Sequence, residues 1–204
     1  MADKLIVASS NPGKVEEIRA ILADVPIEIQ SLSEYPNVPE IVEDGKTLEE
    51  NALIKSRIIF NHMKIPVISD DSGLEVFALG MQPGVISARY AGQNVTYADN
   101  NRKLIREMKD LKGDKRKAQF RCVAVFKDKD IEKSFEGVCE GTIIDHEMGV
   151  GGFGYDPLFV PKGFDKTFAE LPNVVKNRIS HRAKAFNQLR HFLLRNFVNN
   201  NPRS

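Results

Sequence analysis

The sequence predicts an α/β protein built on a mixed β-sheet. Short apolar runs of strand length are followed by segments with apolar residues at helical spacing. Further along the chain, two consecutive segments form a hairpin pattern, and this mixture of hairpins and helices favours a mixed sheet. The 204 residues are enough for one sizeable core or two small lobes, and we expect a single domain over residues 1–204.

The first 68 residues read as alternating strands and helices. An apolar run is followed by a turn and then by apolar side chains at positions 15, 18, 21 and 22, the spacing of one helix face. Thr47 with Glu50 three residues later matches a capping box at a helix N-terminus. We therefore expect a strand at 5–8, a helix that includes 15–22, a strand at 26–29, a loop at 31–46, a helix from 47 to about 63 and a strand at 65–68.

The remaining residues add a hairpin and two more helices. Apolar side chains at alternate positions from 118 to 126 indicate one face of a half-buried strand. We expect a returning strand at 74–79, a helix at 96–111, hairpin strands at 117–126 and 131–144, a short strand at 158–160 and an amphipathic helix from about 182 to 197. Residues 199–204 have nothing to bury and are expected to fray.

The charge balance argues against an extended nucleic-acid surface, because 29 Lys and Arg side chains are matched by 28 Asp and Glu side chains. Cys122 and Cys139 fall in predicted strands without metal-ligand spacing or a secreted disulfide pattern, so we expect core thiols in a reducing compartment. No leader opens the sequence, and no apolar run approaches the roughly 18 residues of a membrane span. We therefore expect a soluble cytoplasmic protein that binds neither membrane nor nucleic acid.

The turn at residues 9–14 is a candidate anion site. A turn between a strand and a helix directs free backbone N–H groups and the positive end of the helix to one point, where a phosphate can bind. The segment is not a Walker A loop, because its first Gly is missing and Val15 follows Lys14 where Ser or Thr would bind magnesium. An ordinary turn with a surface lysine fits the same residues equally well.

Two acid pairs form a second candidate site. Asp70 and Asp71 follow an apolar strand, and successive strand side chains point to opposite faces, so both can face one site only if the chain turns, which Gly73 permits. Glu43 and Asp44 lie in the loop before a predicted helix and could complete a site for a hard cation. Magnesium suits such oxygen ligands better than zinc, because no constellation of His and Cys is present. The alternative is that the adjacent acids form a solvated loop or a helix cap.

Residues 149–157, with the sequence GVGGFGYDP, are the third candidate. Four glycines in six residues argue against a core-packing role. Phe153, Tyr155 and Asp156 on that backbone suit a flat ring with polar edges. The alternative is a tight crossover between strands, with both aromatic side chains packed inward.

The segment Ser180–His181–Arg182 opens the predicted final helix, and Lys176 lies shortly before it. Ser180 is a suitable N-cap, but basic residues near a helix start oppose the helix dipole. This unfavourable placement indicates ligand contacts for His181 and Arg182. The spacing indicates no nucleophile with a suitable partner, so a covalent mechanism is not expected.

Six short blocks, taken together and in order, resemble the signature blocks of the inosine triphosphate pyrophosphatase family: SSNPGK, VEDG, SDDSGL, PGVISARYAG, GGFGYDPLFVP and ISHRAKAF. They run from residue 9 to residue 186, and the glycine–aromatic block together with the Ser-His-Arg block is highly specific. The resemblance implies an elongated mixed β-sheet flanked by helices, with two lobes and an active-site cleft between them. It also implies a homodimer that uses Mg²⁺ to hydrolyse ITP, dITP and XTP to the monophosphate and pyrophosphate.

Carried over position by position, the resemblance implies roles for individual residues. Magnesium would be held by Glu43 and Asp71, and Asp71 would also accept the proton of the attacking water. Asp70 would support the chain around it or lie in the outer metal shell. The phosphates would be held by Ser9, Ser10, Asn11, Pro12, Gly13 and Lys14, with Lys55 as a further cation. The rest of the nucleotide site would be lined by Ser72, Phe153, Gly154, Tyr155, Asp156, Lys176, His181 and Arg182.

The base is expected to be selected at its position 6. A positively charged donor, Arg182 or a protonated His181, pairs with a 6-oxo group but meets the amino group of adenine donor to donor. Leaving such buried groups unpaired costs ~1–3 kcal/mol. Stacking on Phe153 or Tyr155 would add affinity without distinguishing purines. Two alternatives stay open: a Maf-like pyrophosphatase that prefers other nucleotides, and a nucleotide-binding module without catalysis.

Overall fold

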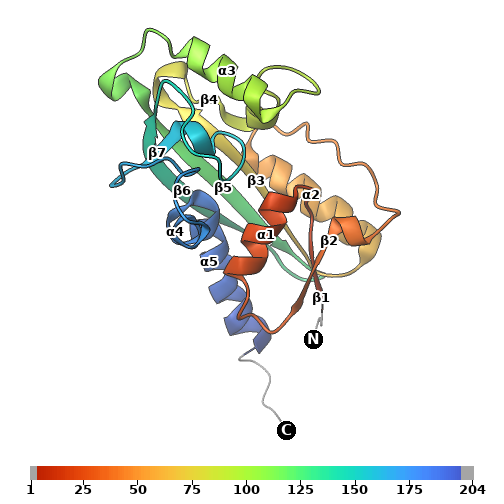
Figure 1. Cartoon of the computed structure of the whole chain (residues 1–204). Coiled ribbons are helices and arrows are strands. Elements are labelled where there is room, and N and C mark those ends of the chain that lie inside the picture. Colours follow the sequence, from red (N-terminus) through yellow and green to blue (C-terminus); the bar gives the residue numbers. More distant parts are fainter. Residues whose placement is uncertain (1–3, 199–204) are drawn as a thin grey trace. The chain divides into compact units, whose positions relative to one another are not determined.

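A computed structural model describes residues 4–198. Within these residues seven strands form one sheet (Figure 1). Their order is β2 (Glu28–Ser31), β1 (Lys4–Val7), β3 (Val67–Val76), β5 (Lys117–Lys127), β6 (Glu132–Ile143) and β7 (Phe159–Pro161), with β4 (Gln82–Pro83) paired to β3 outside this path. β1 pairs in parallel with β2 and with β3. β4 pairs antiparallel with β3, and β7 pairs antiparallel with β6. The predicted mixed-sheet α/β fold is therefore confirmed.

The chain divides into two compact units. Unit 1 contains residues up to 71 together with 122–137 and 182 onward, and unit 2 contains residues 72–121 and 138–181. Three strands contribute residues to both units: β3 (Val67–Val76), β5 (Lys117–Lys127) and β6 (Glu132–Ile143). Whether the units act as a single domain, or correspond to the implied lobes, stays a prediction.

Unit 1 is layered. Its other elements are β1 (Lys4–Val7), α1 (Pro12–Ile21), β2 (Glu28–Ser31), a 3₁₀ turn (Leu32–Glu34), α2 (Leu48–Met63), α5 (His181–Leu193, from its second residue) and a π-helical turn (Leu194–Val198). Leu5 and Val7 pack into a core with α1 and α5, whereas Ile6 packs toward α2, as strand alternation requires. Helices α1 and α5 therefore cover one face of these strands and α2 covers the other (Figure 1).

Unit 2 has a core of its own. Its elements are a 3₁₀ turn (Phe77–Leu79), β4 (Gln82–Pro83), a 3₁₀ segment (Gly84–Arg89), α3 (Tyr97–Glu107), two more 3₁₀ turns (Gly113–Arg116, Asp156–Leu158), β7 (Phe159–Pro161) and α4 (Asn173–Ile179). Leu74 on β3 and Leu104 on α3 join Phe120 and Phe159 in this core. Thr96 caps α3 in a full capping box with Asp99, so the predicted helix start is confirmed.

The largest difference from the predicted elements concerns β3. Strands at 65–68 and 74–79 with a turn at Gly73 are wrong, because a single strand runs from Val67 to Val76. Asp70 and Asp71 therefore lie within a strand and do not end one. Gly73 is required by close packing, since a Cβ there would lie 2.3 Å from the carbonyl oxygen of Gly84. The strand continues through its acids because both carboxylates have cationic partners, described below.

Other differences are smaller. α4 is missing from the predicted elements, because its seven residues, NVVKNRI, are too few to show a helical period. The final helix begins at His181 and ends at Leu193, where the π-helical turn follows. The strand expected at 26–29 lies at Glu28–Ser31, a shift of the size usual for element boundaries.

Two further expectations concern the cysteines and membrane-spanning helices. Cys122 and Cys139 are buried, as predicted. Over residues 4–198 no helix is both long enough and apolar enough to span a membrane. The predicted fraying of residues 199–204 falls outside the described residues.

Candidate active site

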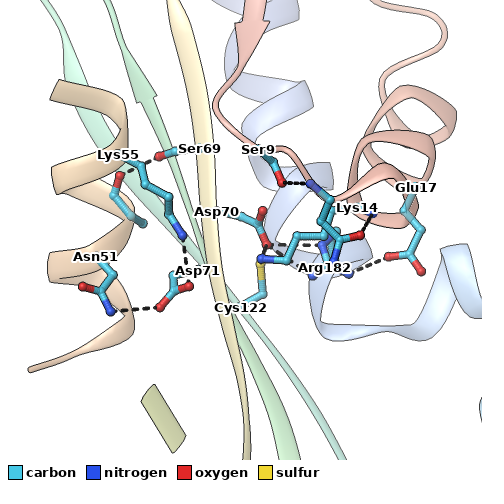
Figure 2. A network of polar contacts seen from close by, with 12 residues as sticks. Ser9, Lys14, Glu17, Asn51, Lys55, Ser69, Asp70, Asp71, Cys122 and Arg182 are labelled. Atoms are coloured by element: carbon cyan, nitrogen blue, oxygen red, sulfur yellow. Dashed lines mark hydrogen bonds and ion pairs between the residues drawn. The ribbon is translucent and has the colours of Figure 1, made fainter. Parts of the chain in front are cut away.

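The two acids of β3 point to opposite sides of the strand (Figure 2). Alternation of side chains along a strand imposes this arrangement when the chain does not turn. Both carboxylates are buried, with Asp70 1% and Asp71 8% exposed, and each contacts a different set of cations. The two acids of unit 1 therefore form ion pairs with different cations, one set on each side of β3.

Asp70 binds two cations and anchors the turn at residues 9–14 (Figure 2). Its Oδ2 lies 3.1 Å from Lys14 Nζ and 3.2 Å from Arg182 Nη2. Arg182 Nη1 also donates to Glu17 Oε2 at 2.6 Å, and the Cys122 thiol lies 3.9 Å from Asp70 Oδ2. Burial opposes ionisation of Asp70, but attraction by Lys14 and Arg182 outweighs it and holds the pKa of Asp70 well below its usual range. Asp70 thus remains a carboxylate that fixes Lys14 and Arg182.

The turn at residues 9–14 is closed by an asparagine cap. The Asn11 Oδ1 atom accepts hydrogen bonds from the backbone N–H groups of Gly13 and Lys14 at 3.0 and 3.2 Å. Asn11 N in turn donates to Ser9 Oγ at 3.2 Å. The expectation of free N–H groups is therefore wrong for Gly13 and Lys14, because an Asn at the N-cap satisfies them. The part of this turn suited to an anion is the Lys14 ammonium, whose side chain is partly exposed.

On the other side of β3, one ammonium bridges two carboxylates. Lys55 Nζ of α2 lies 3.0 Å from Asp71 Oδ1 and 3.0 Å from Glu43 Oε2. Burial raises the pKa of Asp71, and attraction by Lys55 offsets only part of this effect. Burial alone would lower the pKa of Lys55, but attraction by Asp71 and Glu43 raises it. The two directions are compatible, because Glu43 repels a negative charge on Asp71 and attracts a positive charge on Lys55.

Asn51 completes this group and was not among the predicted site residues. Its Oδ1 accepts from Gly45 N at 2.8 Å, and its Nδ2 donates to Asp71 Oδ2 at 3.4 Å. Asn51 therefore ties the loop that carries Glu43 to β3. A Cβ on Gly45 would lie 2.6 Å from Asn51 Oδ1, so only glycine fits there. The signal in the sequence is the spacing, since Asn51 precedes Lys55 by one helical turn and shares its face of α2.

The start of α2 differs in part from the predicted capping box. Thr47 Oγ1 accepts from Glu50 N at 3.1 Å, as predicted. Glu50 Oε2 accepts from Lys46 N at 2.6 Å instead of from the N-cap residue. The helix nevertheless begins at Leu48, which places Asn51 and Lys55 toward β3.

In unit 2, a buried ion pair supports the glycine-rich segment. Lys176 Nζ of α4 lies 2.6 Å from Asp156 Oδ2, which also accepts from Phe153 N at 2.8 Å. The same ammonium lies 4.7 Å from the centroid of the Phe153 ring. Asp156 and Lys176 are 3% and 2% exposed. Two of the predicted residues, Phe153 and Lys176, thus contact the carboxylate of a third, Asp156.

The two aromatic residues of this segment differ in environment. Tyr155 packs into the core of unit 2 and donates its hydroxyl to Ser87 O at 2.8 Å, so inward packing holds for this residue. Phe153 is only half-buried, with its ring centroid 6.3 Å from that of Tyr97. The carbonyl of Gly154 accepts from Asn101 Nδ2 of α3 at 3.2 Å. Phe153 is therefore the more available of the two rings for a ligand.

The other predicted residues are placed as follows. Ser10 and Pro12 are exposed, and Ser72 is half-buried on β3. His181 is buried, with its ring stacked 4.7 Å from that of Phe120. Arg182 contacts Asp70 and Glu17, and its predicted contact with a base oxygen stays a prediction.

Over residues 4–198 no group of three or more His, Cys, Asp or Glu side chains is arranged to hold a metal ion. The two carboxylates Glu43 and Asp71 nevertheless converge on one cation, the Lys55 ammonium. Magnesium is commonly held by one or two carboxylates, with substrate phosphates as further ligands. The donor set therefore fits a magnesium ion that binds together with a phosphate.

Comparison with known proteins gives consistent matches along almost the whole chain. The model of the Ham1 family matches residues 5–192. A dITP/XTP pyrophosphatase from Caldanaerobacter subterraneus subsp. tengcongensis is 46% identical, over 97% of this chain and 99% of its own. The structure of the Staphylococcus aureus Ham1 protein has 41% identity and a TM-score of 0.83, covering 93% of this chain and 97% of the other. A HAM1 protein from Coxiella burnetii has 37% identity and a TM-score of 0.86, covering 94% and 98%.

These matches agree with the resemblance predicted from the six sequence blocks. The family model covers the segments that carry Lys14, Asp71 and Phe153, and the solved relatives share the fold of the described chain. The chain therefore belongs to the Ham1 family.

Proposed function

We propose that this protein hydrolyses non-canonical purine nucleoside triphosphates with a 6-oxo base (dITP, XTP and ITP) to the monophosphate and pyrophosphate, and so removes them from the nucleotide pool. Membership of the Ham1 family supports the proposal, as do relatives of nearly equal length that are named dITP/XTP pyrophosphatase. The structural observation that carries it is the meeting of Glu43, Lys55 and Asp71 on one side of β3, with Lys14 on the other.

Unit 1 is proposed to carry the chemistry. Cleavage between the α- and β-phosphates needs an in-line water, neutralised phosphate oxygens and a stabilised leaving group. Asp71 accepts the proton of the attacking water, while Lys14 and Lys55 supply positive charge to the triphosphate. The turn from Ser9 to Lys14 holds the phosphates through its hydroxyls and the Lys14 ammonium. No covalent intermediate is needed.

Glu43 and Asp71 are proposed to hold Mg²⁺, because their carboxylates already direct oxygens at one cation. A bound Mg²⁺ would neutralise phosphate charge and lower the pKa of a bound water. Asn51 contributes by keeping the Glu43 loop attached to β3.

Unit 2 is proposed to bind the base. Phe153 offers a half-buried ring for stacking, and Asp156 with Lys176 holds the backbone that presents this ring. Ser72, Gly154, Tyr155 and His181 of unit 2, with Arg182 of unit 1, complete the proposed set of substrate-binding residues.

The experiment is a measurement of pyrophosphate release from ITP, dITP, XTP, GTP, ATP and dUTP, with and without Mg²⁺. We expect Mg²⁺-dependent release from the first three and much slower release from ATP and dUTP. GTP tests whether the 2-amino group is also read. Equal rates with all six nucleotides would contradict the selectivity. If no nucleotide releases pyrophosphate, the proposed hydrolysis is rejected in favour of the alternative, a nucleotide-binding module without catalysis.

The Asp71→Asn variant tests the assignment of the proton acceptor. A positioned general base contributes roughly 10²–10⁴-fold, so turnover should fall by about that factor. Binding of ITP should be largely retained, because the lysines that contact the phosphates are unchanged. Normal turnover in Asp71→Asn would contradict the assignment.

The proposal includes a homodimer in the cytoplasm. Membership of the Ham1 family disfavours the Maf-like alternative. The buried thiols Cys122 and Cys139 are consistent with a reducing compartment. Light scattering on the purified protein tests this assembly: a homodimer should give a molar mass twice the 22.9 kDa of the chain.

A further inference from the structure

We propose that Lys55 occupies the place of the divalent cation when no metal is bound, so that metal binding must displace its ammonium from Glu43 and Asp71. This inference rests on the proposed metal pair and deepens it. Lys55 then has two states: in one it neutralises its own carboxylates, and in the other it is available to a phosphate.

The geometry of the three side chains supports this displacement. Lys55 Nζ is 3.0 Å from an oxygen of Glu43 and 3.0 Å from an oxygen of Asp71, although these acids belong to a loop and to β3 (Figure 2). Both carboxylates therefore direct an oxygen at the same point, and that point holds a positive charge. A metal that binds both carboxylates needs the same oxygens.

The charges of the three side chains also favour displacement. The two carboxylates and the ammonium together carry a formal charge of −1, and Lys55 and Asp71 are buried, where charges interact strongly, whereas Glu43 is partly exposed. An ammonium and a divalent ion in contact with the same two oxygens would repel each other at short range. The two cations are therefore expected to compete for the carboxylates.

Contacts that do not involve Lys55 also hold the two carboxylates in place. Asn51 donates to Asp71 Oδ2 and accepts from Gly45 N, so the loop that carries Glu43 stays attached to β3. Asp71 Oδ1, the atom that contacts Lys55, is not the oxygen used by Asn51. Glu43 is partly exposed, which gives an ion access from solvent.

The first experiment measures Mn²⁺ binding by electron paramagnetic resonance, without nucleotide. Lys55→Met should bind Mn²⁺ at least about tenfold more tightly than the wild type, a change of ~1.4 kcal/mol. Lys14→Met is the matched control, because it also removes one lysine contact with a buried acid of β3, 3.1 Å from Asp70 on the other side of the strand. The control should change Mn²⁺ affinity much less. Equal affinity in Lys55→Met and wild type, or an equal gain in Lys14→Met, would overturn the inference.

The second experiment uses the wild type, in case Lys55→Met does not fold. The lysines are acetylated with acetic anhydride, with and without saturating Mg²⁺, and quantified by mass spectrometry. Displacement predicts at least a severalfold rise in acetylation of Lys55. Lys176 should not change, because its buried ion pair with Asp156 involves neither proposed metal ligand. Unchanged acetylation of Lys55 would also overturn the inference.

The displacement of Lys55 and the proposed hydrolysis can be rejected independently of each other. Pyrophosphate release from ITP is measured on the same wild-type sample with Mg²⁺. If the sample releases pyrophosphate but shows neither the Mn²⁺ effect nor the acetylation effect, only the displacement of Lys55 is rejected. If both effects are present without pyrophosphate release, the displacement is supported and the proposed hydrolysis is rejected.

Discussion

Replacing Lys176 with Met should destabilise unit 2 far more than the loss of an ordinary surface lysine. The substitution keeps the length and apolar part of the side chain but removes the ammonium that lies 2.6 Å from Asp156 Oδ2. The Asp156 carboxylate keeps the N–H of Phe153 but remains buried beside an apolar side chain. A carboxylate in that position is poorly stabilised.

The magnitude follows from the burial of both partners. Breaking a buried ion pair by removing one member typically costs about 3–5 kcal/mol. For a chain of this length, each kcal/mol lowers Tm by roughly 2–4 °C, so we expect a decrease of at least about 6 °C. The matched control is Lys162→Met, which removes the ammonium 2.8 Å from Glu140 in an exposed pair of the same unit. An exposed pair contributes about 0–1 kcal/mol, so the control should shift Tm little.

Thermal denaturation followed by circular dichroism measures both variants. The double variant Asp156→Asn/Lys176→Met should be more stable than Lys176→Met, because the buried negative charge of Asp156 is removed together with the Lys176 ammonium. The reasoning is refuted if Lys176→Met lowers Tm no more than Lys162→Met does. It is also refuted if the double variant is less stable than Lys176→Met.

Three further predictions concern other polar contacts of the two units. Asp70 has a lowered pKa in the folded state, so the stability that it contributes is present above its unfolded pKa of about 3.9 and is lost as the pH falls toward the folded pKa. Urea denaturation should therefore show a difference between wild type and Asp70→Asn that is largest above about pH 4 and shrinks below it; a difference that grows on acidification would contradict this. Asn51→Leu should weaken Mn²⁺ binding, measured by electron paramagnetic resonance, because the amide no longer joins Asp71 to the Glu43 loop, and unchanged affinity would argue against that role. Asn101→Leu removes the donor to Gly154 O, so steady-state kinetics should show a raised KM for ITP with kcat little changed, whereas an equal loss in kcat would speak against a role in presenting the base-binding segment.

The local features of this protein could be predicted from the sequence pattern. The cap at Thr96 and the alternating burial at residues 117–121 of β5 depend on neighbours along the chain, so the pattern contained the information. The predicted alternation is wrong for residues 122–126, which are all buried because both faces of the strand are covered there. The continuity of β3 could not be predicted in this way. Its acids look like an interruption unless their cations are known, and Arg182 is separated from Asp70 by 112 positions in sequence.

In the candidate site, too, the individual residues could be predicted from the sequence, but their contacts could not. The six blocks contain Lys14, Asp71 and Arg182, and the resemblance added Lys55, which lies outside the blocks; Figure 2 shows all four side chains. Their pairing was not predictable, because contacts such as Arg182 with Asp70 join residues whose proximity only the fold determines. Asn51 was missed for the same reason, since its role depends on the path of the loop at Gly45.

The alternation of Asp70 and Asp71 limits how this segment can change. The two carboxylates are separated by one peptide unit of an extended strand, and each faces its own cations. A substitution alters one side chain, but an insertion or deletion of one residue in β3 ahead of Asp70 would exchange the two faces for the strand residues that follow. Lys14 and Lys55 would then each meet the side chain meant for the other, or an apolar one. The segment can therefore vary in composition during evolution or engineering, whereas its length is fixed.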